Sequence, residues 1–240
     1  YQVNRMGVAR TFQNIRLFKE MSVIDNIKVG LHESMKYDLA SSLIRLPNYW
    51  KEEKHCTERA FELLDIFHMA DMAYTQAGSL PYGAQRRLEI MRALATSPKL
   101  LLLDEPAAGL DPEGRDEILS EVKEYHKKTG TTVLLVSHSM EDIAKYADRV
   151  LVMSNKKIAM YDTVENVFAR ASELLALGLS VPQVTKIFLK LREMGVDVPA
   201  DVYTVPYAVK MILEAKKRRD AGESLVLPRV DAKKGGTATC

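Results

Sequence analysis

The sequence has 240 residues, of which 47% are hydrophobic and 28% charged, an ordinary balance for one large globular domain or a domain with an appendage. A formal net charge of +2 is too small to indicate nucleic acid as a partner, and two cysteines without metal-ligand spacing indicate a fold without disulfides. No apolar run approaches the roughly 18 residues of a membrane-spanning helix, so any role at a membrane must go through a partner.

The first residues predict a short strand, because Val8 and Thr11 favour extended backbone. Gln13 follows this strand, where its amide could orient a water molecule or contact a metal; a plain surface glutamine is the alternative. The chain begins with Tyr1 rather than Met and enters the strand almost at once. We therefore expect that its natural beginning is missing.

A helical block follows, and we expect it to form a helical subdomain over about residues 23–97, inserted in an α/β core. Ser22 and Asp25 can cap its first helix. Residues 47–49 are predicted to break the helical pattern, and residues 60–67 then form a second amphipathic stripe. His55 and His68 are interpreted as surface or packing residues, since neither has a second ligand at metal spacing.

Residues 79–96 combine a turn with a strong helix. Pro81, Tyr82 and Gly83 form the turn, and the helix behind it carries apolar residues on one face. A glycine-containing turn that opens a helix can present N–H groups and the positive end of the helix dipole to an anion. An ordinary helix start is the alternative.

Four leucines at positions 100–103 lead into Asp104 and Glu105, and Pro98 and Pro106 bound the run. So short an apolar run predicts a buried parallel strand. The two acids would then lie at its carboxyl edge, where open α/β sheets place their ligands. One could hold a metal and the other act as a base. The alternative is a strand that ends in a solvated charged turn.

The next elements alternate between helix and strand. An amphipathic helix follows Asp111 and ends at Gly130. Residues 131–138 predict a second buried strand, with His138 just past its end. A helix at 140–148, a strand at 149–153, a turn and a strand at 158–161 complete the alternation expected for a parallel sheet.

The C-terminal part is predicted to be helical, with helices at 164–176, 182–193 and 205–219. The basic end of the last helix is interpreted as a solvated helix end rather than a lipid site. Residues 163–225 would form a helical extension and residues 226–240 a disordered tail.

Taken in order, these motifs resemble the ATPase subunits of ATP-binding cassette (ABC) transporters over most of residues 7–162. The resemblance implies an α/β fold of the P-loop NTPase type, with a mostly parallel sheet and an inserted helical subdomain. Residues 1–162 would be a partial ABC ATPase domain, truncated at its N-terminus. It also implies that ATP and Mg²⁺ are bound.

The resemblance assigns roles to individual residues. Gln13 resembles the glutamine that senses Mg²⁺ and the attacking water, Asp104 the Mg²⁺-holding aspartate and Glu105 the general base. Asp111 falls in the D-loop, and His138 resembles the histidine that contacts the γ-phosphate. The segment that resembles the signature motif Leu-Ser-Gly-Gly-Gln consists of Leu80, Pro81, Tyr82, Gly83 and Ala84. Only Leu80 and Gly83 match that consensus, and Pro81 replaces the serine that would contact the γ-phosphate.

The two halves resemble different subfamilies. Residues up to about 109 resemble the ATPases of branched-chain amino acid importers. Residues from 110 onward resemble energy-coupling-factor ATPases, which drive vitamin and transition-metal uptake. The chain is interpreted as a hybrid of the two, or else as one divergent subfamily that carries both sets of features.

The sequence contains no Gly-x-x-x-x-Gly-Lys-Ser/Thr, the loop that cradles the phosphates. We therefore expect the fragment to be inactive alone, although a subunit of this family is an ATPase that drives import. The implied partners are a second ABC ATPase subunit, identical or different, and transmembrane permease subunits. The implied location is the cytoplasmic face of the membrane, as a peripheral subunit. Two alternatives are a non-catalytic partner that lends its signature segment to another subunit, and an ABC protein of DNA repair or translation. The absence of long heptad repeats and of a second cassette argues against the latter.

Overall fold

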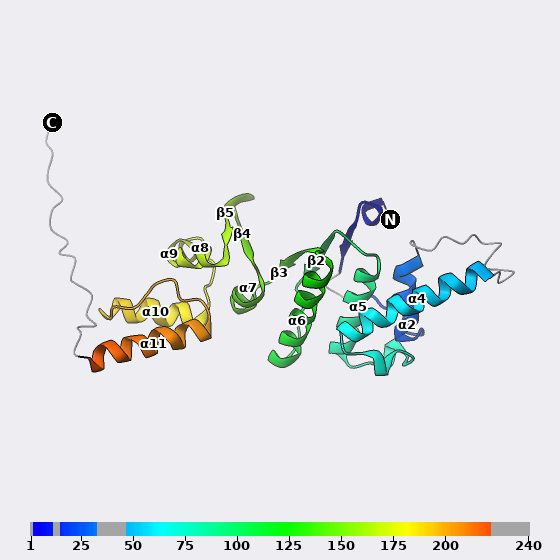
Figure 1. The fold of residues 1–240 in the computed structure, drawn as a ribbon. Helices are drawn as coiled ribbons and strands as arrows, with labels where there is room; N and C mark the ends of the chain where they lie inside the picture. Colours follow the sequence, from blue (N-terminus) through cyan, green and yellow to red (C-terminus); the bar gives the residue numbers. More distant parts are fainter. Residues whose placement is uncertain (1, 12–14, 33–46, 222–240) are drawn as a thin grey trace, which may run out of the picture. The chain divides into compact units, whose positions relative to one another are not determined.

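The computed structural model describes residues 2–11, 15–32 and 47–221 (Figure 1). They divide into two compact units, of which the first ends at His138 and the second begins at Ser139. Gln13 and residues 226–240 lie outside the described residues. Residues 139–162, which the sequence analysis placed with the ATPase domain, group with the C-terminal helices. None of the helices that the structure describes has the length and apolar character needed to cross a membrane.

The first unit combines a small parallel sheet with several helices (Figure 1). Its elements in chain order are α1 (Gln2–Arg5), β1 (Val8–Arg10), α2 (Val23–Leu31), α4 (Pro47–Ile66), the 3₁₀ turns η2 (Ala70–Met72) and η3 (Ala77–Ser79), α5 (Tyr82–Ala95), β2 (Leu100–Asp104), α6 (Pro112–Thr129) and β3 (Thr132–Val136).

Several local signals of the sequence hold in the structure. The Ser22 hydroxyl caps α2 by accepting a hydrogen bond from the Asp25 N–H at 3.2 Å, which confirms the predicted cap. Gly130 ends α6 in the left-handed conformation with φ 72°, which confirms the predicted stop. The predicted break at residues 47–49 is wrong. Pro47 begins α4, where a missing N–H costs nothing because the first turn of a helix has no internal acceptor for it.

The three strands of the first unit run parallel in the order β1-β2-β3. Their register brings Ala9, Leu101 and Val133 side by side, so these residues share one face of the sheet. On that face Leu101 and Leu103 are fully buried. Side chains of the opposite face are more accessible, and Leu134 and Val136 are 49% and 51% exposed. The prediction that residues 131–138 form a buried strand is therefore wrong for alternate positions, because only one face of this strand packs into the core.

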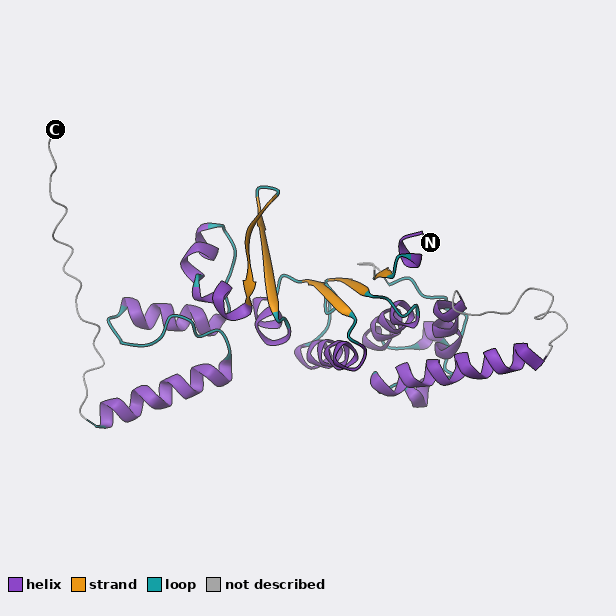
Figure 2. Ribbon diagram, turned by 45° about the horizontal axis from the view of Figure 1, so that its top comes forward, coloured by secondary structure: helices purple, strands orange, loops and turns teal. Residues whose placement is uncertain are grey.

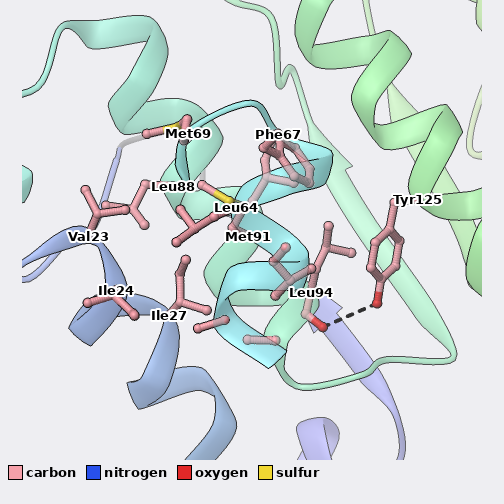
Figure 3. Packing of buried hydrophobic residues seen from close by; sticks show 14 of the residues in the cluster. Val23, Ile24, Ile27, Leu64, Phe67, Met69, Leu88, Met91, Leu94 and Tyr125 are labelled. Atoms are coloured by element: carbon pink, nitrogen blue, oxygen red, sulfur yellow. Dashed lines mark hydrogen bonds between the residues drawn. The ribbon is translucent and has the colours of Figure 1, made fainter. Parts of the chain in front are cut away.

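The core of the first unit lies between α2, α4 and α5, and it reaches α6 and the sheet. Figure 3 shows Val23, Ile24 and Ile27 of α2 facing Leu64 and Phe67, with residues of α5 between them. The apolar stripes of three helices thus pack on each other, which is what their helical spacing requires. On the far side the Tyr125 hydroxyl of α6 donates to the Leu94 carbonyl at 3.5 Å.

The second unit contains a hairpin and helices. Its elements are α7 (Met140–Tyr146), β4 (Arg149–Ser154), β5 (Lys157–Thr163), α8 (Val164–Ala169), α9 (Ala171–Ala176), α10 (Gln183–Glu193) and α11 (Val205–Asp220). One helix was predicted over 164–176; the structure instead has two, separated at Arg170, whose φ of −92° and ψ of 36° are not helical.

The prediction that the strand at 149–153 joins the parallel sheet is wrong. β4 pairs with β5 in an antiparallel hairpin, drawn in orange in Figure 2. Asn155 and Lys156, with φ values of 50° and 63°, form the two-residue turn between Ser154 and Lys157. A two-residue turn with positive φ at both central positions has a backbone twist that matches that of an antiparallel strand pair, and asparagine is common in such turns. This local turn joins the two strands directly and makes them pair with each other.

Candidate functional site

The carboxyl ends of the parallel strands bring the predicted acidic residues to one edge of the first unit. Asp104 is the last residue of β2, and its backbone is paired with Val136 of β3. The Glu105 N–H extends the ladder by donating to the Val136 carbonyl at 3.0 Å. The chain then turns through residues 104–108, which we call the acidic turn, and the Ala108 N–H closes it by donating to the Glu105 carbonyl at 3.1 Å.

Asp104 faces a cationic side chain from the neighbouring strand. Its Oδ2 lies 3.3 Å from a guanidinium nitrogen of Arg10, the last residue of β1. The two side chains are 37% and 59% exposed, so solvent weakens their attraction and the pair is easily exchanged for another cation. The carboxylate of Asp104 is thus at the sheet edge and accessible to a ligand.

Glu105 differs from Asp104 in being largely buried. Its side chain is 19% exposed, and its buried Oε1 forms no hydrogen bond with the residues that the structure describes. The His138 Nε2 lies 3.4 Å from that oxygen, and the His138 side chain is almost fully exposed. A carboxylate at this position can hold a water molecule, as a general base requires.

Residues 80–84 lie at the start of α5. Leu80 is buried, and Pro81 precedes the helix without any side-chain hydrogen bond to its N–H groups. The Tyr82 hydroxyl donates to the Ala108 carbonyl of the acidic turn at 3.4 Å, and the side chain is 49% exposed. Gly83 has room for a methyl group, because an added Cβ would meet only Leu110 at 3.5 Å. The structure therefore places the segment that resembles the signature motif beside the acidic turn of the same chain.

Asp111 lies at the beginning of α6. Its Oδ1 accepts a hydrogen bond from the Gly114 N–H at 3.2 Å, which caps the helix. The contact that the structure shows for this side chain is therefore a capping contact.

The fit of Mg²⁺ to this edge follows from the donors present. No group of three or more potential metal ligands occurs in the part of the chain that the structure describes. Mg²⁺ is commonly held by one or two carboxylates together with waters and substrate phosphates. Asp104 fits such a site, in which a nucleotide and waters would supply the remaining oxygens.

A residue that the sequence analysis overlooked connects α5 to the acidic turn. Arg86 is 1% exposed, and its guanidinium donates to the Pro106 carbonyl at 3.0 Å and to the Asp104 and Glu105 carbonyls at 3.1 Å each. The remaining guanidinium nitrogen, Nη1, donates to the Glu89 carboxylate oxygen Oε2 at 2.6 Å. The signal in the sequence was an Arg–Glu pair at i, i+3 in a helix otherwise rich in apolar residues, because buried charges require such partners.

Comparisons with known proteins show what the chain resembles. Residues 1–108 match the family described as ABC transporter. The energy-coupling factor transporter ATP-binding protein EcfA2 of Caldanaerobacter subterraneus subsp. tengcongensis is 43% identical over 167 residues, 69% of this chain and 58% of that protein. The branched-chain amino acid transport ATP-binding protein LivG of Escherichia coli K12 is 42% identical over 156 residues, 64% of this chain and 60% of that protein. The chain thus spans about three fifths of the length of these two relatives.

The chain is also similar to solved structures of ABC transporter proteins. The ADP conformation of MJ1267, an ATP-binding cassette of an ABC transporter, has a TM-score of 0.59 and 29% identity over 74% of this chain and 70% of that one. The structure of cbiO1 from Clostridium perfringens, part of the ABC transporter complex cbiONQ, has a TM-score of 0.59 and 26% identity. That similarity covers 79% of this chain and 66% of the other.

Proposed function

Because residues 1–108 match the ABC transporter family and the chain has the fold of the P-loop ABC ATPases, we propose that it is the ATP-hydrolysing motor subunit of an importer. In this role ATP binding and hydrolysis drive transport through a membrane permease. The observation that carries the proposal is the edge formed by Asp104, Glu105 and His138 at the ends of β2 and β3.

The two acids have different roles because their surroundings differ. Asp104, exposed and paired with Arg10, would hold Mg²⁺ through its carboxylate. Glu105, largely buried, would accept the proton of the attacking water. Bound Mg²⁺ would neutralise charge on the phosphates. His138 lies close enough to Glu105 to contact the same ligand, and Gln13 is proposed to complete the group.

The phosphate-binding loop is the part of an ATP site that the 240 residues do not contain. That loop supplies backbone N–H groups, a lysine and a hydroxyl to the phosphates and Mg²⁺. We therefore propose that the 240 residues alone bind ATP weakly and do not turn it over. A tight affinity of this chain for ATP, measured by titration with a fluorescent ATP analogue, would refute that.

The proposed partners follow from the resemblance to ATPase subunits of ABC transporters. A second ABC ATPase subunit would pair with this chain, and permease subunits would hold the pair at the cytoplasmic face of the membrane as a peripheral assembly. The relatives' names point to branched-chain amino acids on one side and to the cargo of energy-coupling-factor transporters on the other. Both are proposed cargo classes, and a hybrid of the two subfamilies remains a proposal.

A second candidate function is a non-catalytic partner that lends residues 80–84 to another subunit's ATP site. The geometry that favours it is the start of α5, with Tyr82 half exposed and room for a methyl group at Gly83. Helix N-termini favour anions, so this segment could contact a γ-phosphate held by a partner.

One matched pair of variants tests whether residues 80–84 contact a nucleotide. The chain is mixed with an ABC ATPase subunit that carries a P-loop, and phosphate release is measured. Gly83→Ala, which the structure accommodates, should leave the stimulation intact, whereas Gly83→Asp places a negative charge at the phosphate and should abolish it. Equal stimulation by both variants would show that this segment does not contact the nucleotide.

A further inference from the structure

The guanidinium of Arg86 is the buried connection between α5 and the acidic turn. It donates hydrogen bonds to the carbonyl oxygens of three successive residues, 104, 105 and 106. Carbonyl oxygens that point to one place repel each other unless a donor or cation lies between them. The planar guanidinium, with five N–H donors in a fixed fork, can bond several acceptors at once, which an ammonium cannot do with the same geometry.

The turn that Arg86 holds is conformationally strained. Glu105 has φ 46°, in the left-handed region that a residue with a side chain rarely adopts. The residue before a proline is restricted further, and Pro106 follows Glu105 directly. Such a conformation persists only where the surrounding contacts enforce it. The three bonds from Arg86 are contacts of this kind, and they act on the backbone on both sides of the Glu105 side chain.

The charge of Arg86 is balanced within the same helix. Glu89 is 3% exposed and accepts a 2.6 Å hydrogen bond from the guanidinium, so the buried cation has a buried counter-ion. The other oxygen of Glu89, Oε1, is buried and forms no hydrogen bond within the part of the chain that the structure describes. Burying the Arg86–Glu89 pair costs desolvation free energy. Apolar residues of similar volume would fill the core without that cost, so packing alone does not explain the pair.

We propose that Arg86 is a positioning residue for the proposed reaction: it fixes the acidic turn so that the Glu105 carboxylate is held at the sheet edge. Arg86 lies two residues after Ala84 on α5, so the same side chain also links the segment that resembles the signature motif to the proposed base. The inference rests on the proposed function, because the effect on catalysis requires that Glu105 is the base.

The first test uses the chain itself and does not depend on ATP. Hydrogen exchange is followed at the Glu105 and Ala108 amides, which donate to Val136 and to Glu105 respectively. Arg86→Gln should speed their exchange about tenfold or more by allowing the turn to open locally. Arg86→Lys should rescue little, because an ammonium cannot bond three carbonyls in the fork geometry. The control is Arg87→Gln. This variant removes the charge of the neighbouring arginine, which forms ion pairs with Glu117 and Glu121 of α6.

A second variant guards against loss of folding. If Arg86→Gln is unfolded, the double variant Arg86→Met, Glu89→Met removes the guanidinium together with its counter-ion and leaves no buried charge. It should fold and still show the faster exchange at Ala108. Exchange at wild-type rates in a folded protein that lacks Arg86 would overturn the proposal.

The second test measures catalysis in a fusion that places a P-loop segment of an ABC ATPase before residue 1. In a fusion that hydrolyses ATP, Arg86→Gln should lower kcat about a hundredfold, as expected for a misplaced catalytic group, with KM nearly unchanged. Unchanged kcat together with faster exchange would show that Arg86 holds the turn without serving catalysis, and would overturn the proposal. A wild-type fusion that binds ATP but does not hydrolyse it would instead refute the proposed function, while the exchange result would still report on the turn.

Discussion

The carboxylate of Glu121 makes a sharp prediction about how the stability of the first unit depends on pH. Glu121 lies on the buried side of α6, where its side chain is 6% exposed and its Oε2 lies 3.4 Å from Arg87 Nε without forming a hydrogen bond. Burial raises the pKa of this carboxyl from an ordinary 4.5 to about 7, and nearby Arg87 opposes the shift only in part. The folded protein therefore binds a proton that the unfolded chain releases between these pH values.

The sign and size of the effect follow from this difference. Because the folded-state pKa is raised, the contribution of Glu121 to stability is fully present below the unfolded value and is lost as the pH rises through about 7. A pKa difference of about 2.5 corresponds to about 3 kcal/mol, of which about 2.5 kcal/mol is lost between pH 5 and pH 8. Glu121→Gln removes this dependence, since an amide of the same shape does not ionise. The free energy of unfolding of Glu121→Gln minus that of the wild type should therefore increase by about 2.5 kcal/mol from pH 5 to pH 8.

The assay is urea unfolding at both pH values, followed by the fluorescence of Trp50. It is the only tryptophan of the chain and lies on α4 of the first unit, so the signal reports on that unit. Glu58→Gln serves as control, because that side chain on α4 is 60% exposed and should give a small difference at both pH values. A Glu121→Gln difference that is the same at pH 5 and pH 8 would refute the reasoning.

Two further substitutions test the packing and the helix termination described above. Leu64 is completely buried between α2 and α5, so Leu64→Ala should destabilise the first unit by about 2–5 kcal/mol, measured by the same urea unfolding; a loss under about 1 kcal/mol would contradict the described core. Gly130 has φ 72° and open space around an added Cβ, so Gly130→Ala should cost about 1–2 kcal/mol through backbone strain alone. A neutral Gly130→Ala would mean that α6 does not end in the left-handed conformation.

Local features of the sequence predicted the strand–acid junction well. Four leucines followed by Asp104 and Glu105 predicted a strand with acids at its carboxyl end, and β2 ends at Asp104. The cap at Ser22 and the stop at Gly130 also hold, because these signals act over three or four residues. The ABC ATPase fold was predicted from the order of the motifs, and the family match and the structural neighbours confirm it.

Features that depend on distant contacts were not predicted. Helical spacing places Arg86 on α5, but it does not reveal that the acidic turn some twenty residues later accepts its hydrogen bonds. Alternation of helix and strand predicted one parallel sheet, yet the positive φ values at Asn155 and Lys156 join β4 and β5 into a hairpin of their own. Pro47 was expected to interrupt a helix, but it begins one. Proline is favourable in the first turn of a helix and unfavourable only in its interior.

Phosphate release from ATP by the P-loop fusion, compared with its Glu105→Gln variant, tests the central claim most directly. An amide keeps the shape of the side chain but cannot accept the proton of the attacking water. We predict that the wild-type fusion hydrolyses ATP, and that Glu105→Gln binds ATP with similar affinity but releases no phosphate. A Glu105→Gln fusion that hydrolyses ATP as fast as wild type would contradict the assignment of this edge as the site of ATP hydrolysis.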